Sequence, residues 1–260
     1  MTTAAFDPDS ALVSRVVPAA NHEPRRLAGG PDMLVLHYTG MRDAERAIAW
    51  LATSASRVSC HYVIDEAGQV TQLVPEERRA WHAGESFWAG ATDLNSASIG
   101  IEIHNPGHEL DYREFPAVQV DAVIALSADI CARRGIVPWR VLAHSDIAPR
   151  RKIDPGEKFP WQRLAERGVG HWVAPSPVRA GQVALGLGEE SAGVAAVQEL
   201  FAGYGYETRR DGVFDDGFEK VVRAFQRHFR PALCDGRLDL STLSTLERLI
   251  AALPAGAVSA

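Results

Sequence analysis

The sequence predicts an α/β layer fold, with helices covering a central β-sheet, followed by a small bundle of three helices. Two patterns carry this prediction. Along the first part of the chain, short apolar runs typical of buried strands alternate with segments of helical spacing. The composition changes near residue 170, where a segment rich in proline and glycine begins, and only helix-like segments follow it.

Five segments are expected to be strands, because their apolar residues run together or alternate with polar ones. They are residues 33–37, 60–65, 69–74, 98–104 and 137–144. A turn over residues 66–68 joins the second and third of them as a hairpin. Helices are expected over residues 43–53 and 116–134, and Gly135 closes the longer one just past its end.

The C-terminal part has apolar residues at helical spacing over residues 194–200, 219–228 and 242–252. Asp-Gly pairs mark turns in the two connections. No cluster of His, Asp and Glu lies there, which favours binding over chemistry. The chain thus divides into an irregular N-terminal arm (1–30), an α/β domain (31–172), a linker (173–187) and a helical domain (188–254).

Length and composition bound the function. A chain of 260 residues holds one sizeable core and a small second one. The net charge of −6 argues against nucleic acid as a partner, because no basic excess exists to neutralise phosphates. Three widely spaced cysteines argue against a disulfide framework. No apolar run approaches the ~18 residues that span a bilayer.

The N-terminus has neither a basic start nor an apolar segment, so it does not resemble a signal peptide. We therefore expect a cytoplasmic protein if Met1 is the native start. The periplasm or cell envelope is the alternative, since a chain trimmed of a leader would look the same. A monomer is the default expectation for the oligomeric state.

Three residues far apart in the chain indicate one metal site. His37 follows a buried-type apolar run, His144 ends a similar run, and Asp154 lies ten residues further on. Two imidazoles and a carboxylate suit zinc. Because three protein ligands leave a fourth position open, the pattern is that of a catalytic rather than a structural site. We expect one zinc ion per chain.

Amide hydrolysis at such a centre needs a general base and stabilisation of the oxyanion. Glu102 is the best candidate base, because strand alternation puts Ile101 and Ile103 on the opposite face. Lys152 precedes Asp154 by two residues and so shares its direction in an extended chain. The alternatives are a plain surface carboxylate for Glu102 and a solvated basic run for Lys152.

Two further histidines have informative surroundings. His61 precedes an apolar strand and fits a buried pocket histidine better than a fourth ligand. His82 follows Trp81 in a loop that contains glycine, a pair suited to stacking on a sugar or peptide. A packed loop is the alternative for this pair.

With these residues in place, the chain resembles the zinc-dependent N-acetylmuramoyl-L-alanine amidases of the type 2 family. Phage amidase lysozymes and animal peptidoglycan recognition proteins belong to the same superfamily. The matching segments occur in the right order between about residues 30 and 165. They are residues 36–39, 59–64, 81–84, 95–102 and 143–156.

The resemblance implies a central mixed β-sheet flanked by helices, the type 2 amidase fold. It also implies that His37, His144 and Asp154 bind zinc, that Glu102 acts as base, and that Lys152 supports the transition state. The enzyme would cleave the amide between the lactyl group of N-acetylmuramic acid and the L-alanine of the stem peptide. Substrate-binding positions would be Trp81, His82, Asn95, Arg150 and the pocket residue His61. Arg150 would pair with a stem-peptide carboxylate.

Two departures separate this chain from the phage and animal branch. That branch often has cysteine as third ligand, where this chain has Asp154. It also has a catalytic tyrosine just before the strand histidine, where this chain has Cys60. Both differences place the chain with bacterial amidases that use glutamate as the base.

Residues 188–252 resemble the small helical peptidoglycan-binding domain found on cell-wall hydrolases, and a generic bundle for dimerisation is the alternative. For the whole chain, a non-catalytic peptidoglycan-recognition module is the main rival. It predicts a lost ligand or base, and here all four positions are filled. A different zinc hydrolase on the same scaffold conflicts with the matches at residues 81–84 and 95–102. The sequence leaves open whether intact sacculus or soluble 1,6-anhydro-muropeptide is the main substrate.

Overall fold

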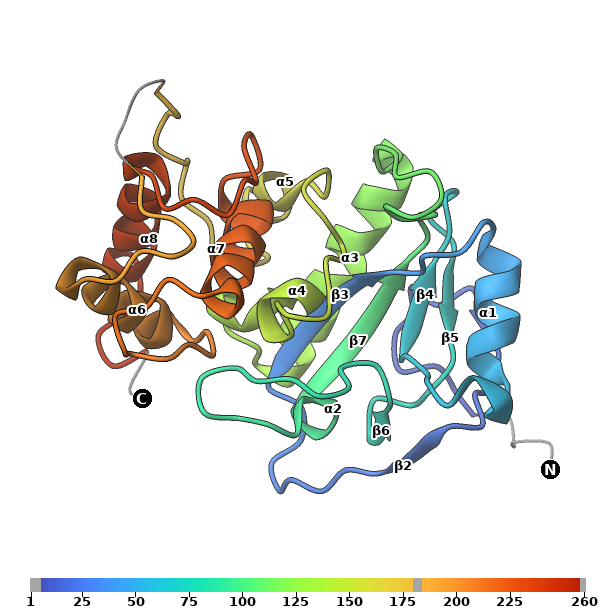
Figure 1. The fold of residues 1–260 in the computed structure, drawn as a ribbon. Helices are drawn as coiled ribbons and strands as arrows, with labels where there is room; N and C mark the ends of the chain where they lie inside the picture. Colours follow the sequence, from blue (N-terminus) through green and yellow to red (C-terminus); the bar gives the residue numbers. More distant parts are fainter. Residues whose placement is uncertain (1–5, 180–183, 258–260) are drawn as a thin grey trace.

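The computed structural model describes residues 6–179 and 184–257. At its centre is a six-stranded sheet in the order β1-β5-β4-β7-β3-β8 (Figure 1). Its strands are β1 (Arg15–Val16), β3 (Met33–Tyr38), β4 (Tyr62–Ile64), β5 (Val70–Gln72), β7 (Ser98–Ile103) and β8 (Val141–Ala143). Only β4 and β5 pair antiparallel, as the expected hairpin, so the sheet is mixed, as predicted.

All five predicted strands form, each shorter than or close to its expected length. The prediction for residues 137–144 is wrong at both ends. Pro138–Arg140 forms a short 3₁₀ turn, because proline offers no N–H to a strand ladder. His144 already begins the short helix α4 (His144–Ile147).

The irregular N-terminal arm is also a wrong prediction for part of its length. β1 joins the edge of the sheet, and β2 (His22–Pro24) pairs with β6 (Arg78–Ala80). Arg25 then anchors the segment by donating hydrogen bonds to the carbonyl oxygens of Glu76, Ser96 and Ser98. Burial lowers the pKa of Arg25 to about 10. Residues 1–5 of the arm lie outside the described ranges.

The two faces of the sheet carry different partners. Leu34 and Leu36 share a core with Ile99, Ile101 and Ile103 and with the long helix α3 (Ala117–Arg134). This helix ends at Gly135 with φ 67°, as predicted. By alternation, Met33, Val35 and His37 face the other way.

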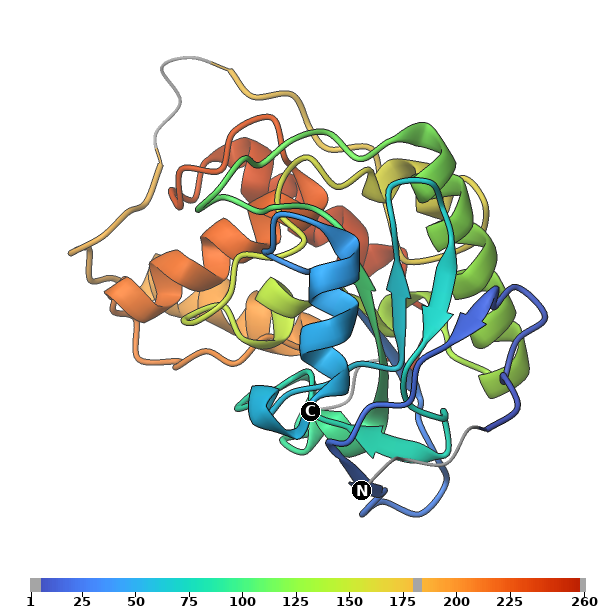
Figure 2. The same cartoon turned by 90° about the vertical axis from the view of Figure 1, so that its right-hand side faces the viewer.

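Helix α1 (Ala44–Ala52) covers a flank of the sheet next to β4 (Figure 2). Asp43 caps its first turn by accepting the backbone N–H of Arg46. Two short helices complete the α/β domain together with α4. They are α2 (Leu94–Ala97) and α5 (Trp161–Ala165).

The three helices predicted near the C-terminus all form, each with a side-chain N-cap. They are α6 (Ala192–Tyr204), α7 (Asp216–Phe229) and α8 (Leu240–Ala251). They gather on one side of the molecule, with α7 next to α4 (Figure 1). Their aromatic residues Phe201, Phe218 and Phe225 pack edge to face.

The helical unit formed by α6, α7 and α8 is continuous with the second face of the sheet. Met33, Val35 and Leu142 belong to the same buried apolar cluster as the residues of α6, α7 and α8. A buried polar contact joins the same parts. Asp146 in α4 accepts hydrogen bonds from the Tyr206 hydroxyl at 2.6 Å and from His228 Nδ1 at 2.7 Å. The two parts are therefore held together by a common core.

Part of the predicted linker packs against this unit. The backbone N–H of Ser176 donates to Thr245 Oγ1, and Arg248 donates to the Ala174 carbonyl. Residues 180–183 of the linker lie outside the described ranges. None of the helices in residues 6–179 and 184–257 is long and apolar enough to cross a bilayer.

A buried ion-pair cluster joins the end of α3 to the sheet. Glu76 is fully buried and accepts from Arg133, Arg134 and the Tyr62 hydroxyl. Burial alone would raise the pKa of Glu76. The hydrogen bonds from Arg133, Tyr62 and Arg134 outweigh burial and hold the pKa at about 2.

This cluster predicts a pH-dependent stability. The folded-state pKa of Glu76 lies below the ordinary value of 4.5, so its contribution is present above pH 4.5 and is lost as pH falls through about 2. A depression of this size corresponds to about 3 kcal/mol. Urea unfolding should show Glu76→Gln well below wild type at pH 6, with the gap shrinking by pH 3. Glu77→Gln, at an exposed neighbour, should show no such gap. A pH-independent gap for Glu76→Gln would contradict this assignment.

Candidate metal centre and cavity

Parallel pairing brings three of the predicted residues to one edge of the sheet. His37 on β3 lies opposite Glu102 on β7. His144 follows β8 directly, and Ala143 before it lies opposite Leu36. Because the carboxyl ends of parallel strands meet at one edge, residues separated by as many as 107 positions become neighbours.

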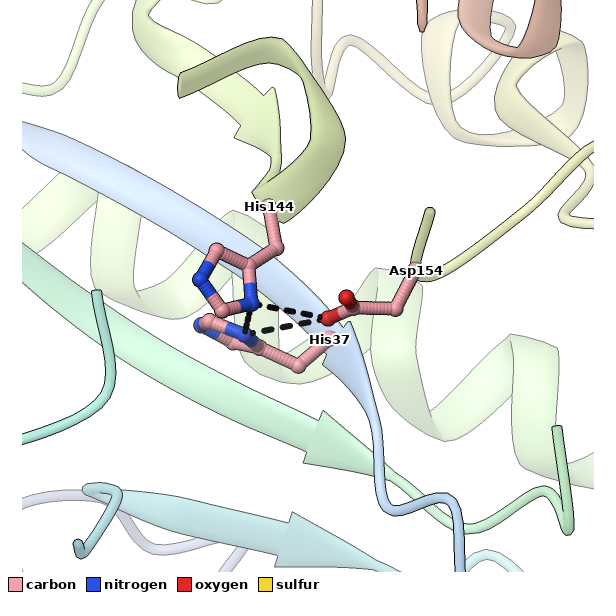
Figure 3. A group of neighbouring side chains, drawn as sticks. All are labelled: His37, His144 and Asp154. Carbon is pink, nitrogen blue, oxygen red and sulfur yellow. Dashed lines mark hydrogen bonds and ion pairs between the residues drawn. The ribbon is translucent and has the colours of Figure 1, made fainter. Parts of the chain in front are cut away.

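Asp154 reaches the same place through a backbone contact. The N–H of Ser145 donates to the Asp154 carbonyl at 3.0 Å, which folds the loop after α4 back onto its start. The Asp154 carboxylate then lies 3.0 Å from His144 Nδ1 and 3.3 Å from His37 Nδ1. The two Nδ1 atoms are 2.8 Å apart (Figure 3). All three side chains are buried.

The triangle formed by His37, His144 and Asp154 has the chemistry of a metal site. His144 Nε2 faces the carbonyl oxygen of Ala83 at 3.2 Å and must donate to it, so a neutral imidazole here has its lone pair on Nδ1. A carboxylate oxygen also accepts only. Ligands of a tetrahedral ion bound at 2.0–2.1 Å lie roughly 3.3 Å apart, close to the separations in this triangle. These residues can therefore hold a metal ion.

Protonation states agree with this role, because metal ligands must be deprotonated. Burial, and then the neighbouring His144, lower the pKa of His37 to about 4. Burial opposes ionisation of Asp154, but the charge of His144 and the hydrogen bonds from His144 and His37 outweigh burial and hold the pKa of Asp154 well below the ordinary range. A metal ion would displace the proton that these hydrogen bonds need. A neutral imidazole and an ionised carboxylate result.

A cavity of about 460 Å³ opens beside the triangle. Its lining includes His144, Asp154, Glu102, Lys152 and Trp81. One carboxylate oxygen of Glu102 is buried with no hydrogen-bond partner among the residues the structure describes. Burial, and then the charge of Asp154, raise the pKa of Glu102 well above its usual value. The cavity thus joins a metal-type centre to a basic carboxylate and a cation.

Three of the residues expected to bind substrate lie outside this lining. Asn95 is buried and accepts the backbone N–H groups of His82 and Ala83. His61 is buried too, accepting from the Gly100 N–H, and burial is the main cause that lowers its pKa to about 3. Arg150 is exposed and lies against Gly217 of α7.

His82 borders the cavity, but its ring is directed at the metal centre. Its Nδ1 lies 3.0 Å from His37 Nε2. Burial, and then the neighbouring His37, lower its pKa well below the ordinary value. A Cβ on Gly100 would approach the ring to 2.5 Å, so glycine is what makes room for His82.

Sequence reasoning missed several residues that line the cavity. Tyr38 ends β3, Trp50 projects from α1 with 47% of its surface exposed, and His108 lies in the loop after β7. Arg151 lines the cavity too, and its guanidinium donates to the carbonyls of Ala83 and Glu85. Only Trp50 carried a signal, an aromatic residue on the polar side of a predicted helix.

Comparison with known proteins agrees with this geometry. Residues 27–157 match the model of the N-acetylmuramoyl-L-alanine amidase family, which is half of the chain. The chain belongs to this family. Residues 190–246 match the putative peptidoglycan binding domain. The chain is thus an amidase with a peptidoglycan-binding unit.

Two relatives show how far the similarity extends. The N-acetylmuramoyl-L-alanine amidase AmiD of Escherichia coli is 40% identical over 84% of this chain and 82% of its own length. The 1,6-anhydro-N-acetylmuramyl-L-alanine amidase AmpD of Escherichia coli is 32% identical, over 58% of this chain and 90% of its own.

Solved structures give the same result. AmiD from E. coli, in complex with anhydro-N-acetylmuramic acid-L-Ala-D-gamma-Glu-L-Lys, matches with TM-score 0.73 at 37% identity, covering 93% of each chain. AmpDH3 from Pseudomonas aeruginosa matches with TM-score 0.69 at 30% identity, covering 95% of this amidase and 98% of that chain. The mixed sheet and the helical unit are therefore features that this amidase shares with solved relatives.

The clearance above Gly100 gives a stability prediction. Gly100→Ala would force a Cβ into the buried His82 ring, and overpacking of this kind costs about 1–3 kcal/mol. Chemical unfolding should show this loss. Gly203→Ala in α6 is the matched control, since its Cβ would meet nothing within 4 Å. It should be neutral or raise stability by up to about 1 kcal/mol. Equal effects from both substitutions would contradict close packing at Gly100.

Proposed function

We propose that this amidase holds one zinc ion through His37, His144 and Asp154, and that Glu102 and Lys152 carry out the proton transfer and charge stabilisation. The observation that carries the proposal is the convergence of three donor atoms of the metal-binding type beside the buried carboxylate of Glu102. Two imidazole nitrogens and one carboxylate oxygen suit zinc and leave a coordination position open.

The bond to be cleaved is the amide between the lactyl group of N-acetylmuramic acid and L-alanine. A zinc ion bound here would supply Lewis acidity to the scissile carbonyl and acidify water. Glu102, with its raised pKa, accepts the proton of the attacking water and returns it to the leaving amine. Lys152 in the cavity lining stabilises the negative charge that develops on the carbonyl oxygen.

The same cavity offers aromatic surfaces for the substrate. Trp81 lines the cavity, and Trp50 adds an exposed ring on the α1 side. Tryptophan faces of this kind suit stacking on a sugar ring. We place the muramyl sugar against this wall. Arg150 would contact only a part of the substrate that extends from the cavity toward α7.

Two substrate sources fit the proposal. AmiD and AmpDH3 have been solved with anhydromuramyl peptides, which supports soluble anhydro-muropeptides as ligands. The helical peptidoglycan-binding unit supports action on the polymer. The non-catalytic recognition module is less well supported, since His37, His144, Asp154 and Glu102 all lie together at one edge of the sheet.

The catalytic test is release of stem peptide by purified protein, followed by mass spectrometry. Chelator should abolish release of peptides that begin with L-alanine, and added zinc should restore it. Glu102→Gln should keep zinc and lose about 10²–10⁴-fold in turnover, the usual contribution of a general base. Glu109→Gln, an exposed carboxylate in the same lining, is the matched control and should stay near wild type.

Each alternative outcome removes a specific part of the proposal. Wild-type turnover in Glu102→Gln would exclude Glu102 as the base. No release by zinc-loaded wild type would favour the recognition module.

Running intact sacculi and soluble 1,6-anhydro-muropeptide side by side distinguishes the two substrate sources. If the helical unit recruits the polymer, release from sacculi should be the faster of the two per available amide. Equal or faster release from the soluble fragment would point to recycling of muropeptides instead.

A further inference from the structure

The His82 ring is the closest polar neighbour of a metal-binding imidazole outside the triangle. It meets the His37 ring edge-on, with an interplanar angle of 88° and the Nδ1–Nε2 contact of 3.0 Å. Its other nitrogen, Nε2, lies 3.3 Å from Ser98 Oγ. Both ring nitrogens are thus engaged inside the protein.

The Ser98 hydroxyl determines the direction of these hydrogen bonds. The Ser98 hydroxyl lies 2.5 Å from the Leu94 carbonyl and donates to it, so Ser98 Oγ accepts from His82 Nε2–H. A neutral His82 then has a lone pair on Nδ1, which accepts from His37 Nε2–H. His37 is left with its lone pair on Nδ1, the atom directed at His144 and Asp154.

The next residue serves the second imidazole in the same way. The Ala83 carbonyl accepts from His144 Nε2, so a neutral His144 has its lone pair on Nδ1. Asn95 Oδ1 accepts the backbone N–H of His82 at 2.9 Å and that of Ala83 at 2.8 Å. One side chain therefore fixes the dipeptide that faces both metal-binding histidines.

We propose that the segment His82–Ala83, held by Asn95, orients the metal centre, with His82 as a positioning residue that sets the tautomer and ring direction of His37. The inference rests on the proposed zinc function and deepens it. It gives His82 and Asn95 a role behind the metal centre instead of contact with substrate. Partners of this kind typically change metal affinity by 10–100-fold when removed.

Zinc affinity, measured by competition with a chromophoric chelator, tests the inference without reference to turnover. His82→Phe keeps a ring but no acceptor, and should weaken zinc binding by about 10–100-fold. His82→Asn keeps an amide oxygen near the position of Nδ1 and should stay within a few-fold of wild type. His171→Phe is the matched control, since His171 bonds Tyr204 away from the centre, and should bind zinc as wild type does.

A measurement on the unchanged protein covers the case in which His82→Phe does not fold. Nitrogen-15 NMR of the zinc-loaded amidase should show His37 and His82 each protonated at Nε2. Protonation of His82 at Nδ1 would overturn the inference, as would a folded His82→Phe that binds zinc like wild type. Failure of the wild type to bind zinc would instead overturn the proposed function, so the two failures are distinguishable.

Discussion

The convergence of two imidazole nitrogens and one carboxylate oxygen on a single point imposes the main constraint on this structure. At separations of 2.8–3.3 Å, these atoms of His37, His144 and Asp154 would repel one another unless a proton or a metal ion lay between them. Burial strengthens this repulsion, because the low dielectric of the protein interior screens charge poorly. Holding these atoms in place therefore requires a rigid frame on every side.

The sheet supplies most of that frame. Parallel pairing of β3 with β7 and β8 fixes His37, Glu102 and His144 at one edge. One face of the sheet packs on α3. The other face, which carries His37, continues into the core of the helical unit. Asp146 ties the same unit to α4, two residues after His144, through Tyr206 and His228. The peptidoglycan-binding unit is thus also part of the support of the centre.

How much of this the sequence predicts depends on the range of the interactions involved. Strand periodicity predicted β3 and β7, and it placed the side chains of Glu102 and Ile101 on different faces of the sheet. This was possible because a two-residue period is a local property. The ligands could be proposed because each is a histidine or aspartate in a distinctive local context. The role proposed for His82 could not be predicted in this way, because it depends on contacts with Gly100 and Ser98, which lie in a strand sixteen or more residues away. The short strands of the N-terminal segment were not predicted for the same reason, because they form only by pairing with β5 and β6.

The most direct test of the account is the position of the metal itself, by anomalous diffraction at the zinc edge from crystals of the zinc-loaded protein. The account predicts one zinc ion bound by Nδ1 of His37, Nδ1 of His144 and an oxygen of Asp154, with the open position directed into the cavity beside Glu102. Binding through Nε2 of either histidine, or a zinc ion held away from this triangle, would contradict it.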